Sequence, residues 1–154
     1  MMPLLVSRRV VGDRLALIAE TLHDLRALPL GTPEQFLQER RNIAAAESYL
    51  RRSLEALLDI GRHILAKGFA VGVSEYKGIA TQLERHGVLS TEEANILRRM
   101  AGYRNRLVHF YHEISPEELY SICVHNLGDI ENIRDTYRRW VNEHPEKIEP
   151  NSSV

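Results

Sequence analysis

The stretch LRRSLEALLDIGRHIL, residues 50–65, decides the fold, because apolar and small residues recur in it at helical spacing. The same stripe begins at Phe36 and ends at Gly68. The run TPEQ at 32–35 supplies a cap hydroxyl, a first-turn proline and a glutamine three residues after the cap. These features predict one long central helix, roughly 50 Å in length at a rise of 1.5 Å per residue.

Further helices are predicted before and after this one in the sequence. Gly87 is the expected stop of the third helix, and Pro145 that of the last. Capping boxes at 90–93 and 115–118 mark two of the starts. The expected ranges are 15–28, 75–86, 90 through at least 106, and 115–144. No alternating strand pattern of useful length separates them, so we expect an all-α, up-and-down bundle of about five helices.

Composition indicates an ordinary globular domain. At 154 residues the chain fits one domain, expected at 1–144, followed by a flexible tail at 145–154. The 20 Lys and Arg face 21 Asp and Glu, so RNA binding requires a local basic patch and not a global positive field. The single cysteine, Cys123, excludes an internal disulfide and suits a cytoplasmic protein. With no signal peptide and no apolar run of about 18 residues, we expect no membrane segment.

Basic and aromatic side chains gather in one segment of the fourth helix. On an ideal helix Arg104 lies on the apolar stripe between Ala101 and Val108, where a core residue belongs. A buried guanidinium needs partners. It either forms an ion pair inside the bundle, with Asp59, Glu47 or another acid of the long helix, or faces a cleft and binds phosphate. The arginines of this segment are Arg98, Arg99, Arg104 and Arg106.

A polar stripe lies beside Arg104. Asn105, His109 and His112 follow i, i+4, i+7 spacing, and an imidazole next to a guanidinium can carry out acid-base chemistry on a phosphodiester. However, an ideal helix separates Arg104 and His109 by roughly 140°. Either the arginine wraps round, or the helix loosens near Val108, or a second copy completes the site across a twofold axis as a homodimer.

The segment RNRLVHFY, residues 104–111, resembles the R-x-x-x-x-H-x-Y signature of HepT-like HEPN ribonuclease toxins. The resemblance extends over most of residues 36–141. It includes the runs at 58–64, 87–89 and 100–103 and the helix that contains Tyr76. It implies a HEPN-type helical bundle.

The resemblance also implies an activity. The expected protein is a metal-independent endoribonuclease toxin in which Arg104 and His109 act on the scissile phosphate of RNA and Asn105 gives polar support. No metal and no cofactor are expected. The alternative is a catalytically silent helical module that binds a nucleotidyltransferase or a nucleotide, or an adaptor unrelated to RNA.

A partner is implied as well. In this family a small nucleotidyltransferase antitoxin of the MntA type attaches AMP to the tyrosine of H-x-Y, which Tyr111 matches. A homodimer within a larger toxin-antitoxin complex is expected.

Three further residues are candidate supports of the site: Asp59, Arg106 and His112. Asp59 either pairs with His63 one turn later or holds Arg104 in place. His112 is either a second proton carrier or an exposed side chain.

Overall fold

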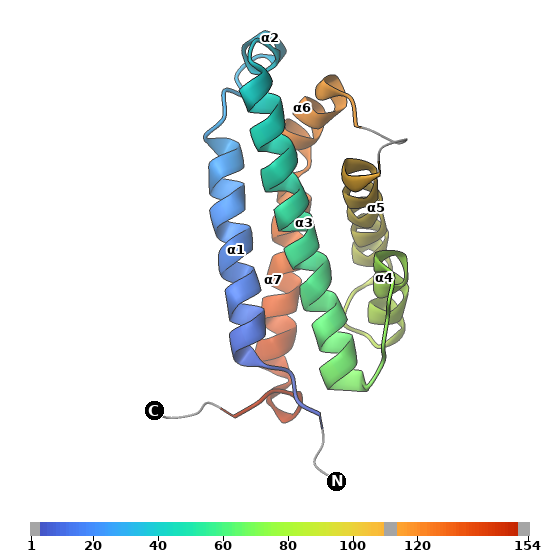
Figure 1. Ribbon diagram of the computed structural model, residues 1–154. Helices are drawn as coiled ribbons and strands as arrows, with labels where there is room; N and C mark the ends of the chain where they lie inside the picture. The colour runs from blue at the N-terminus through green and yellow to red at the C-terminus, as the bar shows by residue number, and fades with distance from the viewer. Residues whose placement is uncertain (1–3, 110–113, 151–154) are drawn as a thin grey trace.

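The computed structural model describes residues 4–109 and 114–150, and over these ranges the chain is all-α, as predicted (Figure 1). No strand forms in the described residues, where the β-type pairing is one isolated parallel bridge between Val6 and Ile148. None of the described helices is both long and apolar enough to cross a membrane. The helices are α1 (Arg8–Arg26), α2 (Pro33–Leu37), α3 (Arg40–Phe69), α4 (Tyr76–Arg85), α5 (Thr91–Val108), α6 (Pro116–His125) and α7 (Leu127–Glu143), followed by the 3-10 turn η1 (Pro145–Lys147).

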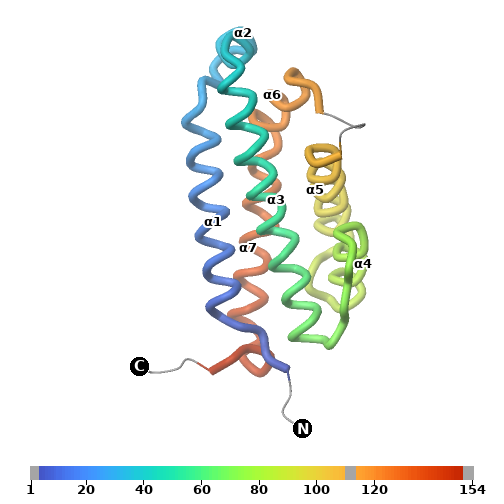
Figure 2. Tube along the Cα trace, viewed as in Figure 1, coloured from blue at the N-terminus to red at the C-terminus, as the bar shows by residue number. Residues whose placement is uncertain are grey.

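Helix α3 is the centre of the bundle, with α1 on one side, α4 and α5 on the other, and α7 behind (Figures 1 and 2). Its predicted apolar stripe forms the core, because Leu50, Leu54 and Leu57 are fully buried. Gly61 lies in the same stripe, and a Cβ atom there would stand 2.7 Å from the Tyr137 hydroxyl of α7. The glycine therefore lets α7 approach α3 closely.

The helix count is higher than the sequence indicated, since two predicted helices are each divided. The long helix is interrupted between α2 and α3, where the Asn42 side chain donates to the Phe36 carbonyl at 3.1 Å. This break lets the buried Phe36 pack on Tyr120 of α6, with ring centroids 5.5 Å apart. The last predicted helix is divided at Asn126, whose backbone (φ −116°, ψ 0°) leaves the helical region. Periodicity alone did not predict these breaks, because apolar positions recur on both sides of each one.

Residues 145–150 pack on the domain, although we expected a flexible tail there. Ile148 is 3% exposed, and Val6 exchanges two backbone hydrogen bonds with this segment, at 2.8 Å with Lys147 and 2.9 Å with Glu149. The Lys147 ammonium also donates to the Gly68 carbonyl at the end of α3. Val6 thus holds residues 147–149 against the bundle.

Two predicted helix ends, the start of α5 and the stop of α4, agree with local chemistry. Ser90 and Glu93 form the complete capping box that begins α5, and Gly87 follows α4 with a φ of +77°. Helix α5 ends at Val108, and its cap residue His109 has extended backbone (φ −96°, ψ 118°).

Candidate active site

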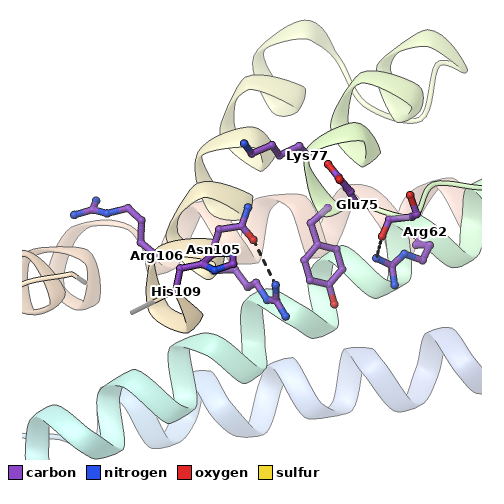
Figure 3. A pocket seen from close by; sticks show the side chains of 9 residues that line it. Arg62, Glu75, Lys77, Asn105, Arg106 and His109 are labelled. Atoms are coloured by element: carbon purple, nitrogen blue, oxygen red, sulfur yellow. Dashed lines mark hydrogen bonds between the residues drawn. The ribbon is translucent and has the colours of Figure 1, made fainter. Parts of the chain in front are cut away.

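An open pocket of about 640 Å³ lies between the start of α4, the last third of α3 and the end of α5 (Figure 3). The three predicted catalytic residues, Arg104, Asn105 and His109, all line it. The complete lining is Arg62, Ser74, Glu75, Tyr76, Lys77, Arg104, Asn105, Arg106 and His109. The structure therefore brings together residues that the sequence placed on two different helical stripes.

Arg104 and His109 both line this pocket, at the end of α5. The His109 amide still donates to the Asn105 carbonyl at 2.9 Å, but the His109 backbone is already extended. This bond keeps His109 in its helical position, and its extended ψ turns the chain only after His109, so the imidazole and the Arg104 side chain still leave the helix roughly 140° apart. Helix α5 does end at Val108, as one of the three arrangements supposed, and Arg104 lines the same pocket from its own stripe of the helix. One chain is sufficient to supply both residues, and the homodimer stays a prediction.

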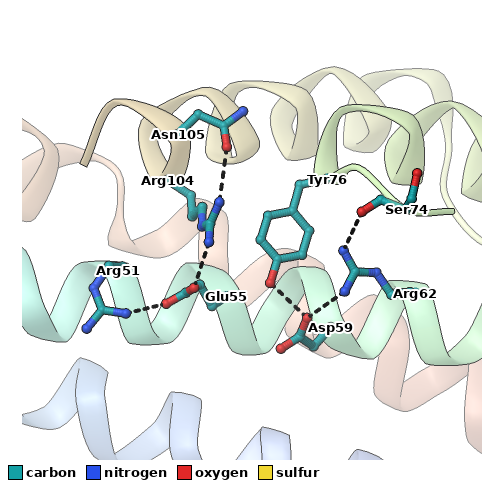
Figure 4. A network of polar contacts seen from close by, with 8 residues as sticks. All are labelled: Arg51, Glu55, Asp59, Arg62, Ser74, Tyr76, Arg104 and Asn105. Carbon is teal, nitrogen blue, oxygen red and sulfur yellow. Dashed lines mark hydrogen bonds and ion pairs between the residues drawn. The ribbon is translucent and has the colours of Figure 1, made fainter. Parts of the chain in front are cut away.

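Arg104 is held from three sides (Figure 4). One terminal nitrogen donates to Glu55 Oε2 of α3 at 3.0 Å, the other donates to Asn105 Oδ1 at 3.4 Å, and the guanidinium carbon lies 4.6 Å from the centre of the Tyr76 ring. The side chain is 23% exposed. The predicted ion pair with an acid of the long helix is present, and Arg104 also lines a cleft, while its binding of phosphate stays a prediction.

Glu55 is shared between two arginines. Its second oxygen accepts a hydrogen bond of 2.6 Å from Arg51, one turn earlier on α3. One carboxylate thus faces two guanidinium groups. Of these groups Arg104 lines the pocket, where a guanidinium is suited to bind an anion such as phosphate.

Tyr76 organises the other half of the network. Figure 4 shows its ring between Arg104 and Arg62, whose guanidinium carbon lies 4.7 Å from the ring centre. Its hydroxyl donates to Asp59 Oδ1 at 2.9 Å. Burial, together with the Asp59 carboxylate, raises the pKa of Tyr76 above its ordinary value, so the hydroxyl stays a donor at neutral pH.

The predicted role of Asp59 needs correction. Asp59 supports the site through Tyr76 and through Arg62, 3.7 Å away, and the acid that holds Arg104 is Glu55. His63, the other partner considered for Asp59, accepts a hydrogen bond from the Ser7 amide at 2.9 Å. His63 therefore fixes the start of α1.

Arg106 lines the pocket but forms a bidentate pair with Glu118 at the start of α6, both bonds being 2.6 Å. This hydrogen bonding holds the pKa of Glu118 below its usual range. The sequence predicted that the Glu118 side chain forms a capping box with Ser115. Ser115 does accept from the Glu118 amide, but the carboxylate binds Arg106 and so links α5 to α6.

Two predicted residues, Tyr111 and His112, lie outside the described residues. Other members of the site were missed by sequence reasoning, chiefly Glu55, Arg62 and Lys77. Glu55 has one local signal, an i, i+4 spacing from Arg51 on the polar face of α3. The stacking of Arg62 on Tyr76 joins different helices and has no local signal in the sequence.

Comparison with known proteins identifies relatives of this chain. The family model described as "Ribonuclease HepT-like" matches residues 17–136. A tRNA nuclease HepT of Aphanizomenon flos-aquae is 30% identical over 112 residues, which is 72% of this chain and 76% of that protein. An mRNA nuclease HepT of Shewanella oneidensis is 23% identical over 129 residues, 84% of this chain and 96% of that protein.

Solved structures share the fold. The tri-AMPylated Shewanella oneidensis HEPN toxin in complex with MNT antitoxin superposes with a TM-score of 0.77 at 23% identity. The alignment covers 84% of this chain and 97% of the toxin. The arrangement around α3 is therefore the HEPN fold.

Proposed function

Because this chain belongs to the ribonuclease HepT-like family, we propose that it is an endoribonuclease that cleaves RNA without a metal ion, with Arg104 and His109 as its catalytic pair. The observation that carries the proposal is the convergence of these two residues and Asn105 on one open, positively charged pocket. A cleft of this kind can bind a backbone phosphate through its local positive charge. The chain therefore needs no net positive charge to bind RNA.

The chemistry follows from the groups present. The RNA 2′-hydroxyl attacks its own phosphorus, so a bond from the 2′ oxygen forms while the bond to the 5′ oxygen of the next nucleotide breaks. His109 transfers the proton that the 2′-hydroxyl loses and the 5′ oxygen gains. Arg104 donates hydrogen bonds to the phosphate oxygens, on which negative charge develops. Asn105 supports Arg104 through its side-chain oxygen. The products are a 2′,3′-cyclic phosphate and a 5′-hydroxyl.

The nuclease proposal is tested with cellular RNA in the presence of EDTA. Wild-type protein is expected to cleave, and Arg104→Ala and His109→Ala are expected to lose at least about 100-fold in rate, the usual contribution of one general acid-base group. Arg9→Ala and His23→Ala are matched controls, because both residues are exposed on α1, away from the pocket. If the wild-type protein cleaves no RNA that the two pocket variants spare, the proposal fails.

We further propose that this nuclease is the toxin of a prokaryotic toxin-antitoxin pair. Its partner would be a nucleotidyltransferase antitoxin of the MntA type that attaches AMP to Tyr111. The AMPylated toxin of Shewanella oneidensis, solved with MNT antitoxin, supports this arrangement. Tyr111 is two residues from His109, which lines the pocket, so a nucleotide ester there would compete with the substrate phosphate. We also propose that the toxin is a homodimer within this larger complex.

Incubation with the partner and ATP tests the modification. The intact mass is expected to rise by one or more AMP groups, RNA cleavage is expected to stop, and Tyr111→Phe is expected to prevent both changes. An unchanged mass would contradict the proposal, as would AMP located on another residue.

A further inference from the structure

The pocket has a second cationic end that the catalytic proposal does not use. In Figure 3, His109 lies toward one end of the pocket and Arg62 at the other, and Figure 4 shows Tyr76 between Arg104 and Arg62. Arg62 and Arg104 stack on the same aromatic ring, at 4.7 and 4.6 Å from its centre. Two guanidinium groups are thus held at a fixed spacing by one side chain.

Arg62 retains capacity to bind a ligand. Its side chain is 38% exposed, and one terminal nitrogen donates to the Ser74 carbonyl at 3.3 Å. Asp59 lies 3.7 Å from the other terminal nitrogen, beyond hydrogen-bond distance. Asp59 also accepts a hydrogen bond from the Tyr76 hydroxyl, so its carboxylate is shared between Tyr76 and Arg62. A guanidinium has five N–H donors, and these contacts do not use all of them.

The surroundings of Arg62 favour an anion. The exposed Lys77 lines the same pocket, and Glu75 is the carboxylate among the nine lining residues. Helix α4 begins at Tyr76 with no side-chain cap, so the positive end of its dipole adds to the charge of Arg62 and Lys77. The cationic lining continues from Arg104 to Arg62 along one open surface.

We propose that Arg62 and Lys77 form a second phosphate subsite, which binds a backbone phosphate next to the one that Arg104 and His109 cleave. The proposal rests on the proposed ribonuclease function and extends it. The substrate is a single strand laid along the pocket with at least two phosphates engaged, one on each side of Tyr76. Tyr76 is a positioning residue, since its ring contacts both guanidinium groups, at 4.7 and 4.6 Å from the ring centre.

A purely structural role for Arg62 makes different predictions. Arg62 also joins α3 to the segment before α4 through the Ser74 carbonyl. If this contact were its whole role, substitution would lower the melting temperature and leave RNA affinity and its salt dependence unchanged. A phosphate contact instead contributes to the slope of log affinity against log salt, about 0.7 per contact for a single strand.

The test uses full-length protein and a single-stranded RNA oligonucleotide that the wild type cleaves, with Arg62→Gln, Arg62→Lys and Lys77→Gln as variants. Arg9→Gln on α1 is the matched control. For Arg62→Gln we expect KM to rise about tenfold, the effect of roughly one charge-assisted hydrogen bond, while kcat stays within about twofold. Lys77→Gln is expected to raise KM in the same direction. Arg62→Lys, which keeps the charge but loses the planar group that stacks on Tyr76, is expected to keep the salt slope and to recover part of the affinity.

Binding is measured separately in the His109→Ala background, so that RNA is not consumed. There, adding Arg62→Gln should reduce the magnitude of the salt slope by about 0.7. Unchanged KM and salt slope in a variant of normal melting temperature would overturn the second subsite and leave the nuclease proposal standing. A fall in kcat and stability at constant KM would also overturn it. A wild-type protein that cleaves no RNA would overturn both proposals.

Discussion

The ion pair between Arg104 and Glu55 makes a quantitative prediction. Replacing Glu55 by alanine removes the carboxylate that Arg104 contacts at 3.0 Å and Arg51 contacts at 2.6 Å. Arg104 keeps its stacking on Tyr76 and its weaker bond to Asn105, but most of its charge is left unpaired in a half-buried position. We expect the bundle to be less stable and the Arg104 guanidinium to lose its fixed orientation.

The exposure of the pair sets the magnitude. The Arg104 and Glu55 side chains are 23% and 24% exposed, so the pair is intermediate between a surface and a buried ion pair. A surface pair contributes about 0.2–1 kcal/mol, and disrupting a buried pair costs about 3–5 kcal/mol. We expect Glu55→Ala to lower the free energy of unfolding by about 2 kcal/mol. For a domain of this size that corresponds to a fall in Tm of roughly 4–8 °C. Arg104→Ala should cost less, because Glu55 keeps Arg51 as a partner.

Urea denaturation of the two single variants and the double variant Glu55→Ala/Arg104→Ala measures the coupling directly. The double-mutant cycle should give a coupling free energy of about 1 kcal/mol. Arg51→Ala is the control, since it removes the more exposed partner and should cost about 0.5 kcal/mol. A coupling below about 0.3 kcal/mol would refute the view that this ion pair holds Arg104 in the pocket.

Three further predictions concern the fold. Gly61→Ala should lower the free energy of unfolding by about 1–3 kcal/mol through overpacking against Tyr137, and an unchanged thermal midpoint would contradict the close approach of α7. Ile148→Ala should cost about 2–4 kcal/mol in urea denaturation, because the side chain is buried beside Val6, whereas a flexible tail would give no effect. Burial raises the pKa of Cys123 to about 12, so the native thiol should not react with a thiol reagent at pH 8 and should react once unfolded. The Cys123 thiol ionises at a lower pH in the unfolded chain than in the folded protein. The free energy of unfolding should therefore fall as the pH rises above about 9. Fast native labelling would show that Cys123 is not buried.

The helices were predictable from the sequence because their signals are local. The stripe of α3 and the capping box of Ser90 and Glu93 depend on residues a few positions apart. The break at Asn126 was not predictable in this way, since apolar spacing continues across it and packing of α6 and α7 decides the path. The docking of Ile148 on Val6 joins the two ends of the chain, and no short-range pattern reports it.

The candidate site was predictable in part. The position of Arg104 on an apolar stripe correctly predicted an acidic partner on the long helix, but Glu55 is 49 positions away and periodicity could not select it. The placement of His109 depends on where α5 ends, which the sequence left open among three arrangements. The roles in catalysis came from the family resemblance, because a guanidinium beside an imidazole also occurs in purely structural networks.

The chemical nature of the new RNA ends tests the proposed reaction most directly. The wild-type protein, in EDTA, is expected to leave a 2′,3′-cyclic phosphate and a 5′-hydroxyl at each cut, and a single 2′-deoxy substitution at the cleaved nucleotide is expected to abolish that cut. Arg104→Ala and His109→Ala should yield neither end. Products with 5′-phosphate ends, or cleavage of the deoxy-substituted strand, would contradict attack by the 2′-hydroxyl in the pocket of Arg104 and His109.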